Sequence, residues 1–221
     1  MGESIGKLSL FNKWHLIIGK LMTQNPRKAK PGSLEYQKTV DQIIWVAAEL
    51  IEEVGYKGLK FDELATRLEC NRATIYRYFD SKQELLESVM LMLMTEVTQD
   101  ILERTAGTKK VTKKSFAESL YQVIETLGEE ARYAIIMMPE NVRLFSELAQ
   151  SHYGELAEEM LHKHLDSPSQ KTPIREGVNW AHIVPWLMHQ IVSYSFLGVP
   201  GESVKAKKDY LERMVAAVII D

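Results

Sequence analysis

Nine consecutive residues, NRATIYRYF, combine side chains that can read and hold nucleic acid. Arg72 and Arg77 can each donate two hydrogen bonds to a guanine edge, and the hydroxyl groups between them can bind phosphates. The run contains no acidic side chain, and the next one along the chain is Asp80. In a short helix held to a core by Ile75, these residues would form a polar face that suits the DNA major groove. The run therefore predicts a DNA-reading helix.

Helical patterns on both sides of this run provide the elements that would position it. Before it, apolar residues recur at three- and four-residue intervals in a helix that Gly55 should stop in the manner of a left-handed cap. A second helix is predicted over about 61–68, and Asn71 should cap the DNA-reading helix. A longer helix then begins at Asp80 or Ser81. The pattern is a helix-turn-helix followed by a long helix.

The rest of the chain is also predicted to be helical, because strand-like alternation is nearly absent. An amphipathic helix over 5–21 leads into a basic linker with Arg27, Lys28 and Lys30, which could lie on DNA or act as a flexible tether. The fold class is therefore all-α. An N-terminal helix with its linker, a three-helix helix-turn-helix domain and a larger helical domain are expected at 1–32, 33–82 and 83–221. In the larger domain, helices are expected near 115–128, 130–137, 140–150, 152–165, 175–198 and 202–220.

Composition limits the classes of protein and of site that the chain can represent. A chain of 221 residues that is 45% apolar can bury a real core, and its net charge of -3 averages over both halves. The single cysteine excludes an intramolecular disulfide and a cysteine-based zinc site. Cys70 is expected to face the core, with a redox-sensing thiol as the alternative. The N-terminal apolar run is broken by Lys20 and has no cleavage site after it. We therefore expect a cytoplasmic protein with no membrane partner.

From Gln37 to Met90 the sequence resembles the DNA-binding domain of the tetracycline-repressor (TetR) family of bacterial regulators. The matching residues are Ala47-Ala48, Gly55-Tyr56, Asp62-Glu63-Leu64-Ala65, Thr74-Ile75-Tyr76-Arg77-Tyr78-Phe79 and Ser81-Lys82-Gln83-Glu84-Leu85-Leu86. Two departures affect the motif. Lys60 stands where the second helix usually opens with Ser or Thr, so a phosphate contact could replace the cap. Glu69 and Cys70 occupy a turn that usually carries Gly, so a non-glycine residue should adopt a strained backbone conformation.

The resemblance implies that Arg72, Thr74 and Arg77 face the groove and that Tyr76 and Lys82 bind phosphates. Lys82 also lies in the first turn of a helix whose amide groups attract phosphate. The alternative is that the arginines form a solvated helix face and the tyrosines are packing residues. The candidate DNA-binding residues are Lys60, Arg72, Thr74, Tyr76, Arg77, Tyr78 and Lys82.

Large, soft and aromatic side chains on the predicted helices of the second half suit an apolar ligand cavity with a few polar anchors. In the 180s segment, Trp186 and His189 share a helical face with His182, and Pro185 would kink the helix. Plain core packing is the alternative for each residue. The candidate ligand-binding residues are Tyr121, Met137, Met138, Phe145, Trp180, Trp186 and His189.

No cofactor, metal or catalytic residue is expected. Glu158 and His162 offer only two metal ligands, and the sequence contains neither a Gly-rich phosphate loop nor a nucleophile elbow. The function we infer is a ligand-responsive transcriptional regulator, most simply a repressor that leaves a double-stranded DNA operator when a small, largely apolar effector binds. It should form a homodimer through its last two helices. The alternatives are a constitutive DNA-binding dimer and a helical ligand carrier or enzyme.

Overall fold

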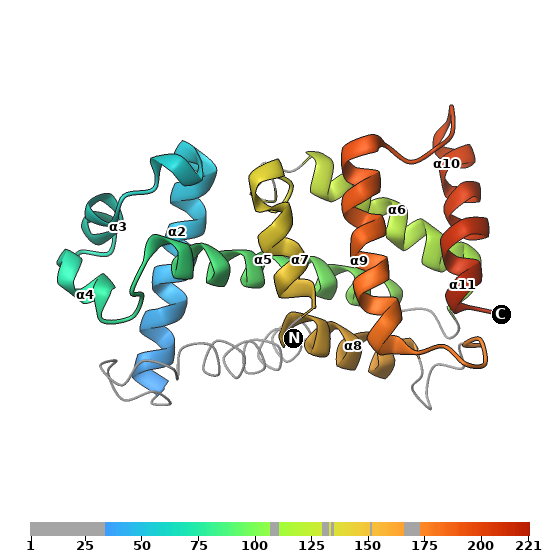
Figure 1. Ribbon diagram of the computed structural model, residues 1–221, viewed down its shortest axis with the longest axis horizontal. Helices are drawn as coiled ribbons and strands as arrows, with labels where there is room; N and C mark the ends of the chain where they lie inside the picture. Colours follow the sequence, from blue (N-terminus) through green and yellow to red (C-terminus); the bar gives the residue numbers. More distant parts are fainter. Residues whose placement is uncertain (1–33, 107–110, 130–132, 134, 151, 166–172) are drawn as a thin grey trace. The chain divides into compact units, whose positions relative to one another are not determined.

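The computed structural model of the chain describes residues 34–106, 111–129, 133, 135–150, 152–165 and 173–221 (Figure 1). The chain divides into two compact units, an N-terminal unit that ends at Met92 and a C-terminal unit that starts at Leu93. The predicted amphipathic helix and basic linker lie outside the described residues. The described residues are helical apart from turns and one isolated antiparallel bridge between Ile174 and Ile220. The prediction of an all-α fold is confirmed.

The described part of the N-terminal unit consists of three helices and the beginning of a fourth. These are α2 (Leu34–Gly58), α3 (Phe61–Arg67), α4 (Arg72–Tyr76) and the first part of α5 (Lys82–Ala106). Gly55 interrupts α2 with a φ of 70° and a ψ of 164°, which is strained for any residue with a Cβ atom. Gly55 therefore breaks the first helix as predicted, although its ψ differs from that of a left-handed helical residue.

Apolar side chains anchor the short helix α4. Ile75 and Phe79 are fully buried, and their spacing of four residues places them on the same side. Other deeply buried residues of this unit include Ile43, Ile44, Leu64, Leu85, Leu86 and Val89. Because its inner face is fixed in this way, α4 has little freedom to turn its polar face away from solvent.

The turn between α3 and α4 adopts the strained conformation that the sequence predicts. Glu69 has a φ of 48°, and it is the one non-glycine residue with a positive φ in the described part of the chain. The N–H group of Cys70 donates to the carbonyl of Ala65 at 2.9 Å and closes the turn. Cys70 itself is half-buried, so the core covers its side chain only in part. Burial still raises the pKa of its thiol, which does not favour a reactive thiolate.

The C-terminal unit contains the remainder of α5 and a set of helices that surround α9 (Figure 1). Helix α9 packs against α6, α7 and α8, and α10 packs against α6. Within the described ranges, no helix is both long and apolar enough to cross a membrane. The helices after α5 are α6 (Lys113–Glu129), α7 (Val142–Ala149), α8 (His152–Leu165), α9 (Trp180–Leu197), α10 (Val204–Leu211) and α11 (Ala217–Ile219).

Three predicted helices of this unit differ from the structure. Residues 135–137 form a turn instead of ending a helix at 130–137, because the side chain of Asn141 donates to the carbonyl of Ile135 at 2.7 Å and Pro139 begins a short 3-10 helix. Helix α9 starts later than predicted because Asn179 caps it. The last predicted helix is divided by a π-helical turn at Glu212–Ala216.

A buried polar contact connects α5 to α8 inside the C-terminal unit. The hydroxyl groups of Tyr153 and Thr98 lie within hydrogen-bond distance of each other, and the carbonyl of Met94 lies 3.2 Å from the Tyr153 hydroxyl and 3.0 Å from the Thr98 hydroxyl. Tyr153 is 1% exposed, and its burial raises the pKa of the phenol to about 12. This contact fixes the second half of α5 against α8.

Candidate nucleic-acid interface

Helix α4 presents a compact polar face to solvent. Asn71 caps it as predicted, because its side-chain oxygen accepts a hydrogen bond from the Thr74 N–H at 2.9 Å. Arg72, Tyr76 and Arg77 are exposed on this helix and its C-terminal end, and α4 contains no acidic residue. A short helix with an anchored apolar side and a basic outer face has the form that enters a DNA major groove.

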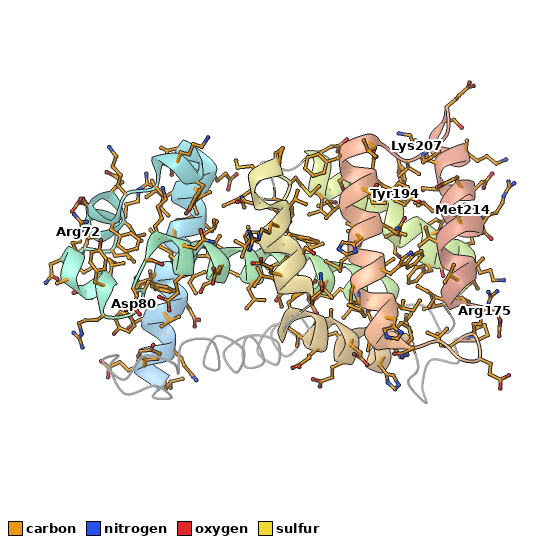
Figure 2. All side chains as sticks on the ribbon, viewed as in Figure 1. Arg72, Asp80, Arg175, Tyr194, Lys207 and Met214 are labelled. Carbon is orange, nitrogen blue, oxygen red and sulfur yellow. The ribbon has the colours of Figure 1, made fainter. Side chains whose placement is uncertain are left out.

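Arg72 is held in place by side chains on both sides of it. Its Nη1 lies 3.2 Å from the Oδ2 of Asp62 on α3, and its Nη2 donates to the Tyr76 hydroxyl at 3.0 Å (Figure 2 labels Arg72). The guanidinium carbon is also 5.3 Å from the centroid of the Tyr76 ring, which packs against Phe61. The hydrogen bond to Tyr76 and the nearby charge of Asp62 raise the pKa of Arg72.

Arg77 has a different environment. It is exposed just beyond α4, and within the described part of the chain its guanidinium has no hydrogen-bond or ion-pair partner. Its backbone N–H donates to the carbonyl of Ala73 at 3.2 Å, so the backbone at this position is still part of the helix end. The two arginines that the sequence singles out therefore differ, one held by neighbours and the other open to a ligand.

Lys82 lies at the start of α5 and is partly covered. Its Nζ donates to the carbonyl of Lys57 at 3.2 Å and lies 4.3 Å from the centroid of the Tyr56 ring. Burial lowers the pKa of Lys82. Lys60 occupies the N-cap position of α3, is exposed, and makes no side-chain capping bond. Both ammonium groups lie in the N-terminal unit, where phosphate contacts are expected of them.

Two predicted DNA-binding residues are less accessible than the prediction requires. Tyr78 is buried, with its ring centroid 5.2 Å from that of Tyr36, so it is a packing residue and not a surface contact. Thr74 is half-buried, and its hydroxyl donates to the Asn71 side chain at 3.2 Å. The accessible candidates are therefore Lys60, Arg72, Tyr76, Arg77 and, in part, Lys82.

The seven predicted ligand-binding residues come from α6, α7, α9 and the turn before α7, and their exposure varies. Tyr121, Phe145 and Trp180 are buried, whereas Met137, Met138 and Trp186 are half-buried. His189 is exposed, and its Nε2 lies 3.4 Å from the hydroxyl of Ser146. Phe145 lies on α7, and Trp186 and His189 lie on α9, which packs against α7. Trp180 forms an edge contact with His162 instead, with ring centroids 6.3 Å apart.

Residues 43–89 match the family model of bacterial regulatory proteins of the tetR family. The matched region covers most of α2, all of α3 and α4, and the start of α5. This N-terminal part of the chain is therefore similar to the TetR family of bacterial regulators. The exposed helix α4 lies within this matched region.

Several solved structures share the fold of this chain. RolR in complex with resorcinol is 14% identical with a TM-score of 0.61, over 83% of this chain and 88% of that one. The TetR-family repressor AlkX from Dietzia sp. strain DQ12-45-1b is 15% identical with a TM-score of 0.61, over 86% and 96%. A TetR-family regulator from Pectobacterium atrosepticum is 16% identical with a TM-score of 0.60, over 85% and 97%. A search of curated proteins found no match.

Two contacts of the N-terminal unit were not predicted from the sequence. One is the pairing of Asp62 with Arg72, and the other is a bidentate pair in which Arg67 on α3 donates to the carboxylate of Glu53 on α2 at 2.7 and 2.5 Å. Both partners of each pair are separated by ten or more residues and by a turn. Helical spacing rules cover only residues three or four apart, so they give no signal for either pair.

Proposed function

We propose that this chain is a TetR-family repressor that binds an operator as a homodimer and leaves it when a small, largely apolar effector binds the C-terminal unit. The observation that carries the DNA-binding part is the exposed basic face of α4, anchored by the fully buried Ile75. Arginine side chains on such a face supply bidentate donors to guanine, and neighbouring lysines supply phosphate contacts.

A DNA-binding test follows directly from the face of α4. Fluorescence anisotropy with labelled duplexes should show binding by the parent chain, and Arg77→Ala should weaken binding to a preferred sequence by about 1–3 kcal/mol if it touches a base. Arg143→Ala changes an exposed arginine of the C-terminal unit and is the matched control. Arg143→Ala should bind DNA like the parent. Equal binding by the parent and Arg77→Ala would contradict the assignment.

Exposed apolar side chains near the end of the chain support the proposed homodimer. Met214 and Val218 are 56% and 38% exposed, whereas Leu211, Val215 and Ile219 are buried within their own subunit. The apolar residues Phe196, Leu197 and Val204 of α9 and α10 are also exposed, and a second copy of the chain could cover such side chains.

Helix α5 supports a route from effector to DNA. It begins at Lys82 in the N-terminal unit and continues past Thr98 in the C-terminal unit, where the Tyr153 contact holds it. An effector that binds one position of α5 more tightly than another would change the spacing of two recognition helices on the operator. A constitutive dimer remains the alternative, since Tyr121, Phe145 and Trp180 are already buried.

The effector is tested with small aromatic and aliphatic compounds. A true effector should raise the melting temperature of the chain and release DNA, and Trp186→Ala should reduce both effects. Trp45→Ala alters an exposed tryptophan of the N-terminal unit and should leave the thermal shift intact. If no compound class raises the melting temperature, the constitutive dimer is the better account.

A further inference from the structure

The structure assigns to Asp62 the role of a positioning residue that fixes the guanidinium of Arg72 for reading a guanine in the DNA major groove. The inference rests on the proposed DNA-binding function and goes beyond it, because Asp62 lies on α3 and carries the wrong charge to bind DNA itself. The observation is the link across the turn, from Asp62 to Arg72 at 3.2 Å and from Arg72 to Tyr76 at 3.0 Å.

The link leaves Arg72 able to bind a base. A guanidinium has five N–H donors, and Asp62 and Tyr76 use one each. Three donors remain, and a bidentate pair with the O6 and N7 atoms of guanine requires two. Asp62 therefore occupies one side of the guanidinium without blocking the contact that specifies the base.

Positioning matters because a free arginine side chain samples many rotamers. Such a side chain loses conformational entropy when it must match one base, and a guanidinium that is already oriented loses less. The ring of Tyr76 adds to the restriction, since it stacks under Arg72 and packs on Phe61 with ring centroids 5.0 Å apart. Arg77 has no described partner of this kind, so its contact should be less selective.

The charge of Asp62 has a second effect on specificity. A carboxylate beside the groove is repelled by phosphates, which weakens binding to DNA of any sequence. Where Arg72 meets its guanine, the same carboxylate supports the contact. Asp62 therefore lowers non-specific affinity and raises the preference for one base pair, and these two effects distinguish positioning from a purely structural role.

The test uses the full chain and a random duplex library. Sequences selected by the parent define the preferred site, and Arg72→Ala identifies the base pair in each half-site that depends on Arg72. We expect Asp62→Asn to reduce discrimination at that base pair by about fivefold to tenfold. Non-specific affinity should stay equal or rise. Tyr76→Phe removes the other hydrogen bond to Arg72 and should relax the same base pair.

Glu63→Gln is the matched control, because Glu63 is an exposed acid in the same turn of α3 that pairs with Arg67 and not with Arg72. It removes one negative charge and should leave the base preference unchanged. If the parent selects no sequence, the proposed function itself fails. If the parent selects a site and Asp62→Asn and Tyr76→Phe discriminate like the parent, or if Asp62→Asn binds the site more tightly with its preference intact, the positioning role is wrong.

Discussion

The ammonium group of Lys82 lies 4.3 Å from the centroid of the Tyr56 ring and donates a hydrogen bond to the carbonyl of Lys57, so the start of α5 is joined to the end of α2. A lysine that is held by a ring and a carbonyl keeps its charge at a fixed place on the surface. A phosphate that meets this charge gains a contact without reading a base, which makes Lys82 a test of backbone binding.

Lys82→Ala should weaken binding to specific and random duplexes alike. Loss of one phosphate contact should flatten the slope of log affinity against log salt concentration by about one unit for each site lost. Anisotropy titrations at several salt concentrations measure this slope. Lys113→Ala is the control, because Lys113 is also the first residue of its helix, α6, but belongs to the C-terminal unit. An unchanged slope for Lys82→Ala would remove it from the interface.

Met214→Glu combined with Val218→Glu should convert the dimer into monomers that lose specific DNA binding and keep their helix content. Both side chains are exposed in the single chain, so charge on them is tolerated unless a second copy covers them. Sedimentation velocity at micromolar concentration and circular dichroism measure the two properties. Val142→Glu, at a 40% exposed residue of α7, should remain dimeric. A parent chain that sediments as a monomer would count against the dimer.

Phe79→Ala should destabilise the N-terminal unit by about 3–5 kcal/mol, because a fully buried ring is lost and leaves a cavity. Since Phe79 follows α4 and helps to anchor it, the affinity for DNA should decrease together with the stability of the N-terminal unit. Chemical denaturation followed by circular dichroism gives the free energy of unfolding. Leu34→Ala, at a 69% exposed position of α2, should change it little.

Tyr153→Phe should show a pH-dependent effect on stability. Folding raises the pKa of Tyr153 from 10.0 to about 12. Below pH 10 the phenol is neutral in both states, and Tyr153→Phe costs only its hydrogen bonds, about 0.5–1.5 kcal/mol. Between pH 10 and 12 the unfolded phenol ionises first, so the parent loses stability as pH rises. The phenylalanine variant does not lose stability in this way. The difference in the free energy of unfolding between the two chains, measured by denaturation, should therefore shrink over that interval. A constant difference would contradict the burial of the hydroxyl.

Sequence reasoning predicted the N-terminal unit well because its signals are local. The Asn71 cap and the anchoring pair Ile75 and Phe79 depend on residues three or four apart, and the strained turn at Glu69 depends on a missing glycine. Tyr78 was misjudged because an aromatic residue beside a basic run carries no sign of the Tyr36 ring that covers it.

The C-terminal unit was less predictable because its departures from the helical pattern depend on contacts between residues far apart in the sequence. The apolar residues from Leu211 to Ile219 follow one helical period, and only packing decides that Val215 is buried and Met214 is exposed. The late start of α9 has a similar cause. The N–H of Arg175 donates to the carbonyl of Ile219, and the N–H of Asp221 donates to that of Pro173, so residues 173–175 pair with the end of the chain instead of starting a helix. No residue in that segment indicates this backbone pairing.

Selection of binding sites from a random duplex library by the parent chain is the most direct test of a dimer that reads DNA with α4. We predict an enriched inverted repeat whose half-sites are centred about one helical turn, or a multiple of it, apart. The chain with both Arg72→Ala and Arg77→Ala should lose that enrichment and keep weak, salt-sensitive binding. Enrichment of no sequence by the parent, or of the same repeat by the double variant, would contradict the account.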